Sequence, residues 1–596
     1  MSEERRQAAL AYRTEAAELA RSRHHPEHRA NGDEQRYAEA NYAMSFTKGL
    51  PHDSQTGLVF DRRDFEAFRK AIDEGYIDAF SMSVPVATFC TGLDRRRWEA
   101  PTAGLVFELE GPDPQAVTMP PAPALGSAEL AYEMAEDYEL ALLRDVPFSA
   151  FRAGGGNADL ASAVGDLNGL PYDPAAPGLP HADGSHRPRK TEGGALTEQT
   201  AFRGSSPGVE VGPYLSQFML IGNVDQAGAT AVSDGTIAYG ALTIDQRVPV
   251  AAATDFMTDL ASWLEVQRGC ETYDPATLFA QPPARRFICC PRDLATYVHF
   301  DALYEAYLNA ALILLGMNTP FDPGFANLAG QKDPGIGIDY GAIFHVEPGG
   351  GHATVNRQAG GFALFGGPHI LTLVTEVATR ALKAVRYQKF NVHLRLRPET
   401  LAGRIELATA IENAFPAIGT PFSDLRAAIA PTITRVEAAT GGTAFLPMAF
   451  QEGSPMHPAY GAGHAAVAGA CVTILKAFFD TSAVFVRRDG REAFLRPEAG
   501  DTLLAYMAAD DGSALVEETG GPALTLEGEL NKLAANISIG RNMAGVHYYS
   551  DYYDSLRMGE EIAIGILEEQ ALGYKTDRFV MSVPTFDGTV RRIGAR

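Results

Sequence analysis

Cysteine is scarce in this sequence of 596 residues, and its five copies form no recognisable pattern. They are Cys90, Cys270, Cys289, Cys290 and Cys471. Because no two of them stand in a CxxC spacing, a zinc site is not expected. Their odd number and the lack of a paired framework predict mostly buried thiols in a reducing compartment.

Targeting and membrane segments are also missing from the pattern. The charged N-terminal stretch (residues 1–28) contains no apolar core of the kind that signal peptides have. No apolar run is long enough to cross a membrane, since ALILLGM (311–317) is too short. We therefore expect a cytoplasmic protein without a membrane partner, and export by another route stays open.

Positive charge is the third shortage. The chain has 50 Lys and Arg against 74 Asp and Glu, which gives a formal net charge of −24. Such a surface repels nucleic acid and anionic membranes, so neither is expected as a general partner. A local cluster of Lys, Arg and His works against this overall charge, and it therefore indicates a functional site.

Helical periodicity is what the sequence has in quantity. Apolar residues recur at three- and four-residue steps in several long segments. These segments are 127–146, 255–269, 292–316, 369–390, 465–480 and 526–545. Alternating patterns are few and short, with 483–490 as a candidate hairpin strand. We predict a mainly α fold with a few short β-hairpins.

The hydrophobic share of 46% permits one large merged body. We expect an N-terminal, mostly helical half (1–290) and a C-terminal helical bundle (291–596). A stretch rich in Gly, Pro, Ser and Asp (153–215) predicts a long loop that is functional or lies across a surface.

Six basic side chains stand near the ends of expected helices in the C-terminal half. They are Lys389, Arg397, His457, His464, Arg541 and His547. Each alone has an ordinary structural explanation, such as a cation at a helix C-terminus. Together they suit a tetrahedral oxyanion, which needs several cationic or N–H donors from different elements. We therefore treat them as one candidate anion site with an imidazole acid/base.

The segment GAGH (461–464) fits the same site. It stands where a loop turns into a helix, and a helix N-terminus offers free N–H groups and partial positive charge. Gly461 and Gly463 would let the backbone approach an anion closely. A dinucleotide-binding loop is excluded, because no buried strand precedes GAGHAAVAGA and no βαβ unit surrounds it.

Four motifs in this order resemble the signature of the vanadium-dependent haloperoxidases, a version of which the type-2 acid phosphatases share. They are Lys389, Arg397-Pro398, Ala462-Gly463-His464 and Arg541-x5-His547-x3-Asp551. The eight-residue step from Lys389 to Arg397, and His457 seven residues before His464, resemble the algal-type bromoperoxidase branch. Similar fragments run from NGDE (31–34) to ELNKLAANISIGRNMAGVHYYSD (529–551), so the resemblance extends nearly end to end.

The resemblance implies a helical-bundle architecture of the haloperoxidase and acid-phosphatase type, with a vanadate cofactor. His547 would be the single covalent ligand of vanadium. The vanadate oxygens would be bound by Lys389, Arg397, Arg541 and the Gly463 N–H group. His464 would be the catalytic acid/base, and Lys389 would also polarise the peroxide.

Other positions would adjust or support the site. His457 and Gln388 would shape the halide side of the pocket. Ala462 departs from the serine that is usual in the family, which removes a hydrogen bond worth about 1–3 kcal/mol to a charged acceptor. For the second nitrogen of His547, Asp551 is the candidate partner if that stretch is helical. For His464 the candidate is Asp301, with an ordinary surface acid as the alternative.

The implied reaction is the oxidation of bromide, with chloride left open, by hydrogen peroxide to a hypohalous acid equivalent that halogenates a small organic substrate. Vanadium would act as a Lewis acid. The resemblance also implies a homo-oligomer, a dimer or larger. A structural calcium stays open, because the sequence has no EF-hand loop. Two other functions stay open: an acid phosphatase with His547 as nucleophile, and a non-catalytic oxyanion-binding protein in which Ala462 marks a decayed site.

Overall fold

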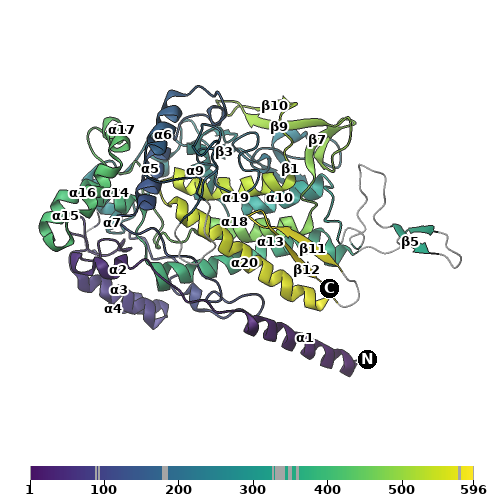
Figure 1. Ribbon diagram of the computed structural model, residues 1–596, viewed down its shortest axis with the longest axis horizontal. Coiled ribbons are helices and arrows are strands. Elements are labelled where there is room, and N and C mark those ends of the chain that lie inside the picture. Colours follow the sequence, from purple (N-terminus) through teal and green to yellow (C-terminus); the bar gives the residue numbers. More distant parts are fainter. Residues whose placement is uncertain are drawn as a thin grey trace.

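The computed structural model describes residues 2–87, 90, 94–176, 186–324, 328, 342–346, 352–356, 361–574 and 579–594. Helices account for 46% of the chain and strands for 11%, which confirms the predicted mainly α fold. Figure 1 shows long helices gathered in one body, with small sheets at its periphery.

The centre of the body is the helix α18 (Gly463–Phe478), which is rich in alanine and almost entirely buried. It packs against α13 (Gly367–Tyr387), α19 (Leu526–Met543) and α20 (Tyr549–Gly573). At the contact with α20 the two backbones touch. A Cβ added to Gly559 would lie 1.9 Å from the Ala466 carbonyl oxygen, and one added to Gly469 would lie 1.9 Å from that of Leu556. Only glycine therefore fits at these two positions.

Helices from both halves of the chain surround this centre. α5 (Ala128–Leu142) packs against α17 (Ala430–Thr440), α19 and α20, while α9 (Pro291–Phe300) lies on α19 and α10 (Glu305–Gly316) on α13. One hydrophobic core cluster includes residues from Tyr37 to Ile593. The boundary at residues 290 and 291 stays a prediction, although the shared core agrees with one merged body.

The other described helices are shorter or peripheral. They are α1 (Ser2–Ser22), α2 (Asp33–Arg36), α3 (Arg62–Glu74), α4 (Ile77–Ser83), α6 (Ala158–Asn168), α7 (Leu260–Gln267), α8 (Pro275–Leu278), α12 (Phe362–Phe365), α14 (Pro398–Glu406), α15 (Ala408–Ala414) and α16 (Pro421–Ala428). A π-helix (Gln388–His393) continues α13 directly.

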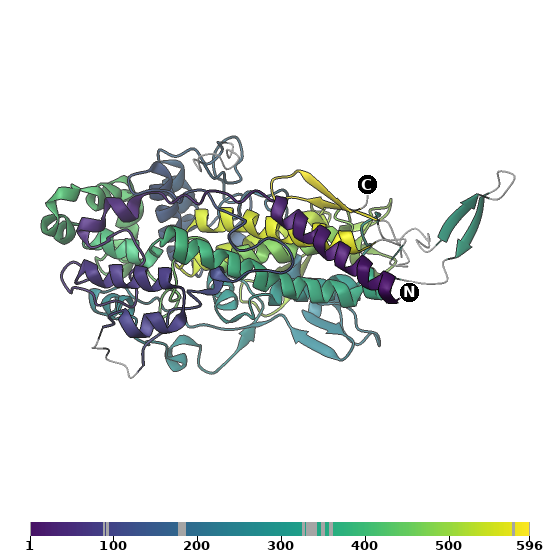
Figure 2. The ribbon, with the colours of Figure 1, turned by 90° about the horizontal axis from the view of Figure 1, so that it is seen from below.

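All described sheets are antiparallel and small. The largest has four strands in the order β10 (Leu515–Thr519), β9 (Thr502–Ala508), β7 (Val484–Arg488), β8 (Arg491–Leu495). Its β7–β8 pair, with Val484 opposite Leu495, is the hairpin that the sequence predicts. The two-stranded pairs are β1 (Thr236–Tyr239) with β2 (Leu242–Asp245), β3 (Val248–Pro249) with β4 (Arg285–Arg286), β5 (Ala342–Val346) with β6 (His352–Asn356), and β11 (Val580–Pro584) with β12 (Val590–Gly594). Figure 2 shows β5 and β6 standing away from the helical body.

The predictions for the long loop and for the cysteines need correction. The loop expected over 153–215 contains α6, because the Asn157 side chain caps the helix at Leu160 N–H and leucines such as Leu160 and Leu167 are buried beneath it. The cysteines do form a pair, since a disulfide joins Cys90 to Cys270. The two cysteines are 180 positions apart in the sequence, so no local pattern indicates the bond. The remaining cysteines are buried free thiols, as predicted.

One helical stretch, Phe362–His393, is long and apolar enough to cross a membrane by length and composition. The expectation that no stretch reaches this length is therefore not met. The stretch nevertheless packs against α10, α18 and α20. It also carries the buried cations Arg386 and Lys389, which suits the core of a folded body.

Candidate active site

Arg397 is the centre of the predicted cluster. It precedes α14, and its guanidinium is buried. Its Nη1 donates to Nε2 of His547 at 3.0 Å, and its Nη2 donates to Nδ1 of His457 at 2.6 Å. Three of the six predicted side chains, which are up to 150 residues apart in the sequence, are thus in direct contact.

Two further cations, Lys389 and Arg541, belong to the same predicted cluster. Lys389 lies in the π-helix, where its Nζ donates to the carbonyl oxygens of Pro458 at 2.6 Å and Ala459 at 3.0 Å. Arg541 lies in the last turn of α19, and its Nη1 donates to the Val298 carbonyl oxygen at 2.7 Å. The Nε of Arg541 is buried and has no hydrogen-bond partner among the described residues. It is available to a ligand.

His464 is the second residue of α18 and pairs with an acid. Its Nε2 lies 3.0 Å from Oδ1 of Asp301, which follows the C-terminal end of α9. The Asp301 side chain is buried, so the alternative of an ordinary surface acid is wrong. Because a carboxylate accepts, Nε2 of His464 carries the proton and its Nδ1 keeps a lone pair.

The N-terminus of α18 lacks a side-chain cap. Ala462 is the N-cap residue, and its own N–H donates to Oγ of Ser555 at 2.9 Å. A Cβ added to Gly463 would meet only Leu382 Cδ1, at 3.5 Å, so there is open space beside this backbone. A Cβ at Gly461 would lie 2.1 Å from Ser555 Oγ. Gly461 thus serves packing against α20 rather than the approach of an anion, which corrects the prediction for this residue.

Burial and mutual repulsion make the cluster electrostatically costly. Desolvation is the largest cause of every shift, and the neighbouring cations add to it. The pKa values of Lys389, His457 and His547 fall well below their usual ranges, and that of Arg397 falls to about 9. Lys389, Arg397, Arg541 and His464 all contribute to the lowered pKa of His547. A multiply charged oxyanion would stabilise such a buried cluster of cations and imidazoles.

Arg386 belongs to the site although sequence reasoning missed it. It is buried in the last turn of α13, three residues before Lys389, and adds to the lowered pKa values of Lys389 and His457. Burial lowers its own pKa to about 10. Its Nη2 lies 3.5 Å from Oε2 of Glu99, while its Nε and Nη1 have no partner among the described residues. The spacing of three residues on one helix face could have revealed it.

Asp551 orients His547, as predicted. It lies in the first turn of α20, and its Oδ2 accepts from Nδ1 of His547 at 2.8 Å and from the Tyr548 N–H at 3.1 Å. This places the proton of His547 on Nδ1 and leaves a lone pair on Nε2, which accepts from Arg397 and which a ligand would take in its place.

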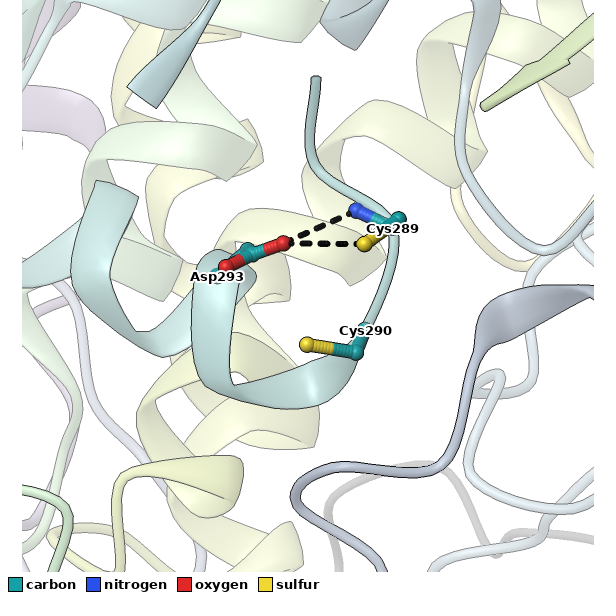
Figure 3. Close-up of side chains that lie close together, drawn as sticks. All are labelled: Cys289, Cys290 and Asp293. Atoms are coloured by element: carbon teal, nitrogen blue, oxygen red, sulfur yellow. Dashed lines mark hydrogen bonds between the residues drawn. The ribbon is translucent and has the colours of Figure 1, made fainter. Parts of the chain in front are cut away.

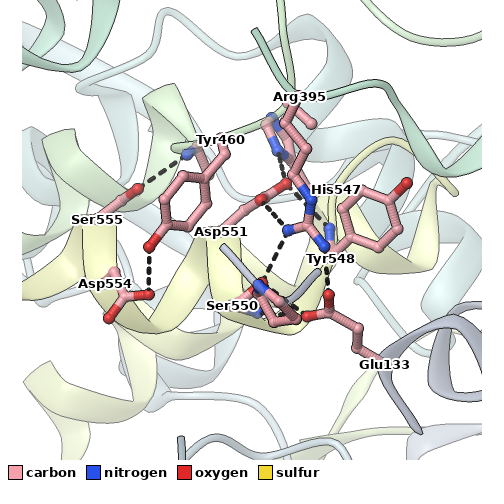
Figure 4. Close-up of polar contacts among 12 residues, drawn as sticks. Glu133, Arg395, Tyr460, His547, Tyr548, Ser550, Asp551, Asp554 and Ser555 are labelled. Carbon is pink, nitrogen blue, oxygen red and sulfur yellow. Dashed lines mark hydrogen bonds and ion pairs between the residues drawn. The ribbon is translucent and has the colours of Figure 1, made fainter. Parts of the chain in front are cut away.

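A second arginine holds Asp551 in turn. Arg395 Nη1 donates to Oδ1 of Asp551 at 2.9 Å, and its Nη2 pairs with Glu133 of α5. Its guanidinium carbon lies 3.8 Å from the centre of the Tyr548 ring. Figure 4 shows Glu133, Arg395, Asp551 and His547 as one chain of contacts. Sequence reasoning missed both Arg395 and Glu133, because nothing local marks them.

The side chain of Gln388 was predicted to face the anion pocket, but its hydrogen bonds go to other residues. Its Nε2 lies 3.2 Å from the Val117 carbonyl oxygen and 3.3 Å from Nδ1 of His28, and its Oε1 lies 3.2 Å from Nε2 of His393. These contacts do not support a direct contact with the anion. A role for Gln388 in halide preference stays a prediction.

A different cluster, Cys289, Cys290 and Asp293, places three potential metal ligands close together (Figure 3). Asp293 already accepts hydrogen bonds from Nε and Nη2 of Arg286, at 2.8–3.1 Å, and from the Cys289 N–H, at 3.1 Å. Its charge is therefore compensated within the chain, and we assign no metal to it.

Comparisons with known proteins agree with this geometry. Residues 432–571 match the family model of the VCPO second helical-bundle domain. Vanadium-dependent bromoperoxidases from Corallina pilulifera and Corallina officinalis are each 42% identical to the chain over 644 aligned positions, covering 99% of it and 98% of the relative. That of Ascophyllum nodosum is 32% identical, covering 90% of this chain and 84% of the relative.

A solved structure is similar over the same length. The homohexameric second vanadate-dependent bromoperoxidase of Ascophyllum nodosum superposes with a TM-score of 0.74 at 27% identity, covering 99% of this chain and 90% of that one. The resemblance drawn from four short motifs is confirmed. The roles of the individual residues stay predictions that the contacts support. The chain belongs to the family of vanadium-dependent bromoperoxidases.

Proposed function

We propose that the chain uses vanadate and hydrogen peroxide to oxidise bromide to a hypobromous acid equivalent, which brominates small organic compounds. The observation that carries this proposal is the contact of buried Arg397 with His547, whose Nδ1–H is already committed to Asp551. A neutral imidazole nitrogen whose lone pair accepts only from a cation, with further cations around it, is a ligand set for a metal oxyanion.

The residues present fit vanadate. His547 Nε2 would bind the vanadium, while Lys389, Arg397 and Arg541 would neutralise the oxygens together with the Gly463 N–H. The Arg541 Nε, which has no partner among the described residues, provides a donor, and the open space beside Gly463 leaves room for the anion. When bound, vanadate supplies a Lewis-acidic centre that polarises hydrogen peroxide.

The proton steps fall to His464. Its Nε2–H is held by Asp301, so Nδ1 is the nitrogen that takes a proton from incoming hydrogen peroxide and later returns it to a leaving oxygen. Asp301 stabilises the imidazolium that forms and fixes the ring orientation. Acid/base assistance of this kind contributes about 10²- to 10⁴-fold in rate.

The experiment that tests the proposal uses the purified chain in two forms. Loaded with vanadate, it should oxidise bromide in the presence of peroxide, and a halide-dependence curve then decides whether chloride is also used. Without vanadate, it should hydrolyse a phosphate ester slowly or not at all. Hydrolysis without halide oxidation would assign the pocket to a phosphatase instead, and tight vanadate binding without turnover would assign it to an oxyanion-binding protein.

For assembly, we propose a homo-oligomer, because the similar solved structure is homohexameric and covers 99% of this chain. The molar mass in solution tests this. A cytoplasmic location stays a prediction. The Cys90–Cys270 disulfide is more typical of an oxidising compartment, so fractionation of the source cells is the deciding measurement.

A further inference from the structure

The C-terminal end of α9 touches the anion site at two residues and carries two more, between them, that the proposed mechanism leaves unused. The Val298 carbonyl oxygen accepts from Arg541 at 2.7 Å, and Asp301 accepts from His464 at 3.0 Å. The two residues between them are His299 and Phe300. Since consecutive Cα atoms are about 3.8 Å apart, both lie at the edge of the anion site.

His299 has the surroundings of a general base. Its ring stacks on Phe450 with centroids 3.8 Å apart, and its Nε2 lies 2.8 Å from Oε1 of Glu452. The other oxygen, Oε2 of Glu452, is buried without a described partner. Burial lowers the pKa of His299, which favours a neutral ring. Because Nε2–H is donated to the carboxylate, Nδ1 keeps a lone pair, and 17% of the side chain is exposed.

Aromatic surface continues outward from His299. Phe300 meets the edge of the imidazole with centroids 4.6 Å apart and is 45% exposed. Its ring also lies 5.5 Å from that of Phe279 and 6.4 Å from that of Tyr273, which is 38% exposed. Exposed aromatic faces beside a polar, catalytic group favour a flat, electron-rich ligand that has a hydroxyl at one end.

We propose that His299, Phe300 and Tyr273, with the buried Phe450 supporting the imidazole from behind, form a subsite that holds a phenolic acceptor beside the anion site. The ring packs against Phe300, and its hydroxyl donates to Nδ1 of His299. This inference rests on the proposed function, because the subsite is useful only where hypobromous acid is released. An acceptor held there meets the reagent before the reagent reaches bulk solvent.

The chemistry balances without another reactant. The ortho or para ring carbon forms a C–Br bond as the Br–O bond of hypobromous acid breaks, and the oxygen leaves as hydroxide. The phenolic proton passes to Nδ1 of His299. The resulting dienone loses its ring proton to the hydroxide, which forms water, and the proton on His299 returns to the phenolic oxygen. The sum is phenol plus hypobromous acid giving bromophenol plus water.

The test is a competition in the vanadate-loaded, full-length protein. Phenol and monochlorodimedone, a non-aromatic acceptor, are offered together, and the product ratio is compared with that from added hypobromous acid. We expect the wild-type protein to favour phenol at least threefold over the free reagent. Phe300→Ala and His299→Gln should bring the ratio to that of the free reagent. Phe60→Ala, the matched control at an exposed phenylalanine outside the subsite, should keep the wild-type ratio.

A separate assay keeps the two proposals distinguishable. Without an acceptor, hypobromous acid reacts with peroxide to give dioxygen, bromide, a proton and water, so bromide-dependent dioxygen release reports the proposed function alone. Dioxygen release together with the free-reagent ratio in the wild type would overturn the subsite only. Absence of dioxygen release would overturn the proposed function. An unchanged preference for phenol in both Phe300→Ala and His299→Gln would also overturn the subsite.

Discussion

Arg395 offers the sharpest test of how the chain prepares His547. Arg395→Met keeps much of the side-chain volume but removes the charge that lies between Glu133 and Asp551, both of which are fully buried. The two carboxylates would then face each other without a cation. Removing one partner of a buried ion pair costs about 3–5 kcal/mol in the free energy of unfolding.

The expected effect on function is separate from this loss of stability. Without Arg395, Asp551 is free to turn or to take a proton, and it no longer holds Nδ1–H of His547 in place. Losing such a supporting contact behind a metal ligand weakens metal binding about 10- to 100-fold. Isothermal titration of the metal-free protein with vanadate measures this directly. Arg395→Lys, which keeps the charge, should recover part of the affinity.

Arg189→Met is the matched control. Arg189 is a buried arginine that pairs with Glu136 on the same helix α5 and lies over the Tyr549 ring at 3.7 Å, but it has no described contact with Asp551. It should cost similar stability and leave the vanadate dissociation constant within about twofold. If Arg395→Met, shown to be folded by circular dichroism, also bound vanadate within twofold of wild type, the positioning role would be refuted.

Three further outcomes are expected. His464→Ala should lower bromide oxidation about 10²- to 10⁴-fold while the vanadate dissociation constant, measured by titration, changes less than about tenfold, and a parallel loss of binding would contradict the acid/base role. Ala462→Ser should tighten vanadate binding about 5- to 150-fold, the equivalent of 1–3 kcal/mol, since it restores a hydroxyl at the N-terminus of α18; no gain in the same titration would show that the hydroxyl cannot reach the anion. Burial lowers the pKa of His52 and of His393 to about 3, so both stay neutral when folded but take up protons when unfolded below about pH 6.5. Stability should therefore fall as the pH falls, by about 2 kcal/mol for each residue at pH 5, and urea unfolding of His52→Gln should show a shallower pH dependence than wild type.

The sequence predicted those parts of the site that are encoded locally. Four of the predicted residues each stand in a short motif at a helix end, and the structure brings the first three close to the fourth. They are Lys389, Arg397, His464 and His547. Asp551 was predicted on the condition that the stretch from His547 is helical. The helix α20 begins at Tyr549 instead, and Asp551 reaches back to His547 from its first turn.

Contacts between distant segments were harder to predict. Glu133 and Arg395 are 262 residues apart and become partners only when α5 packs beside α20. Asp301 was only a guess, because its burial depends on where α9 ends. Gly461 was misinterpreted, since sequence shows a flexible residue but does not show that Ser555 fills the space beside it.

The glycine contact between α18 and α20 has a consequence for the distance between the two catalytic imidazoles. His464 begins α18, and His547 stands just before α20, so their separation follows the spacing of the two helix axes. That spacing is fixed where Gly559 of α20 meets the carbonyl of Ala466, two residues after His464, and again where Gly469 meets the Leu556 carbonyl. The methyl group of a Gly559→Ala variant would push the two helices apart and so increase the distance between two imidazoles that it does not contact.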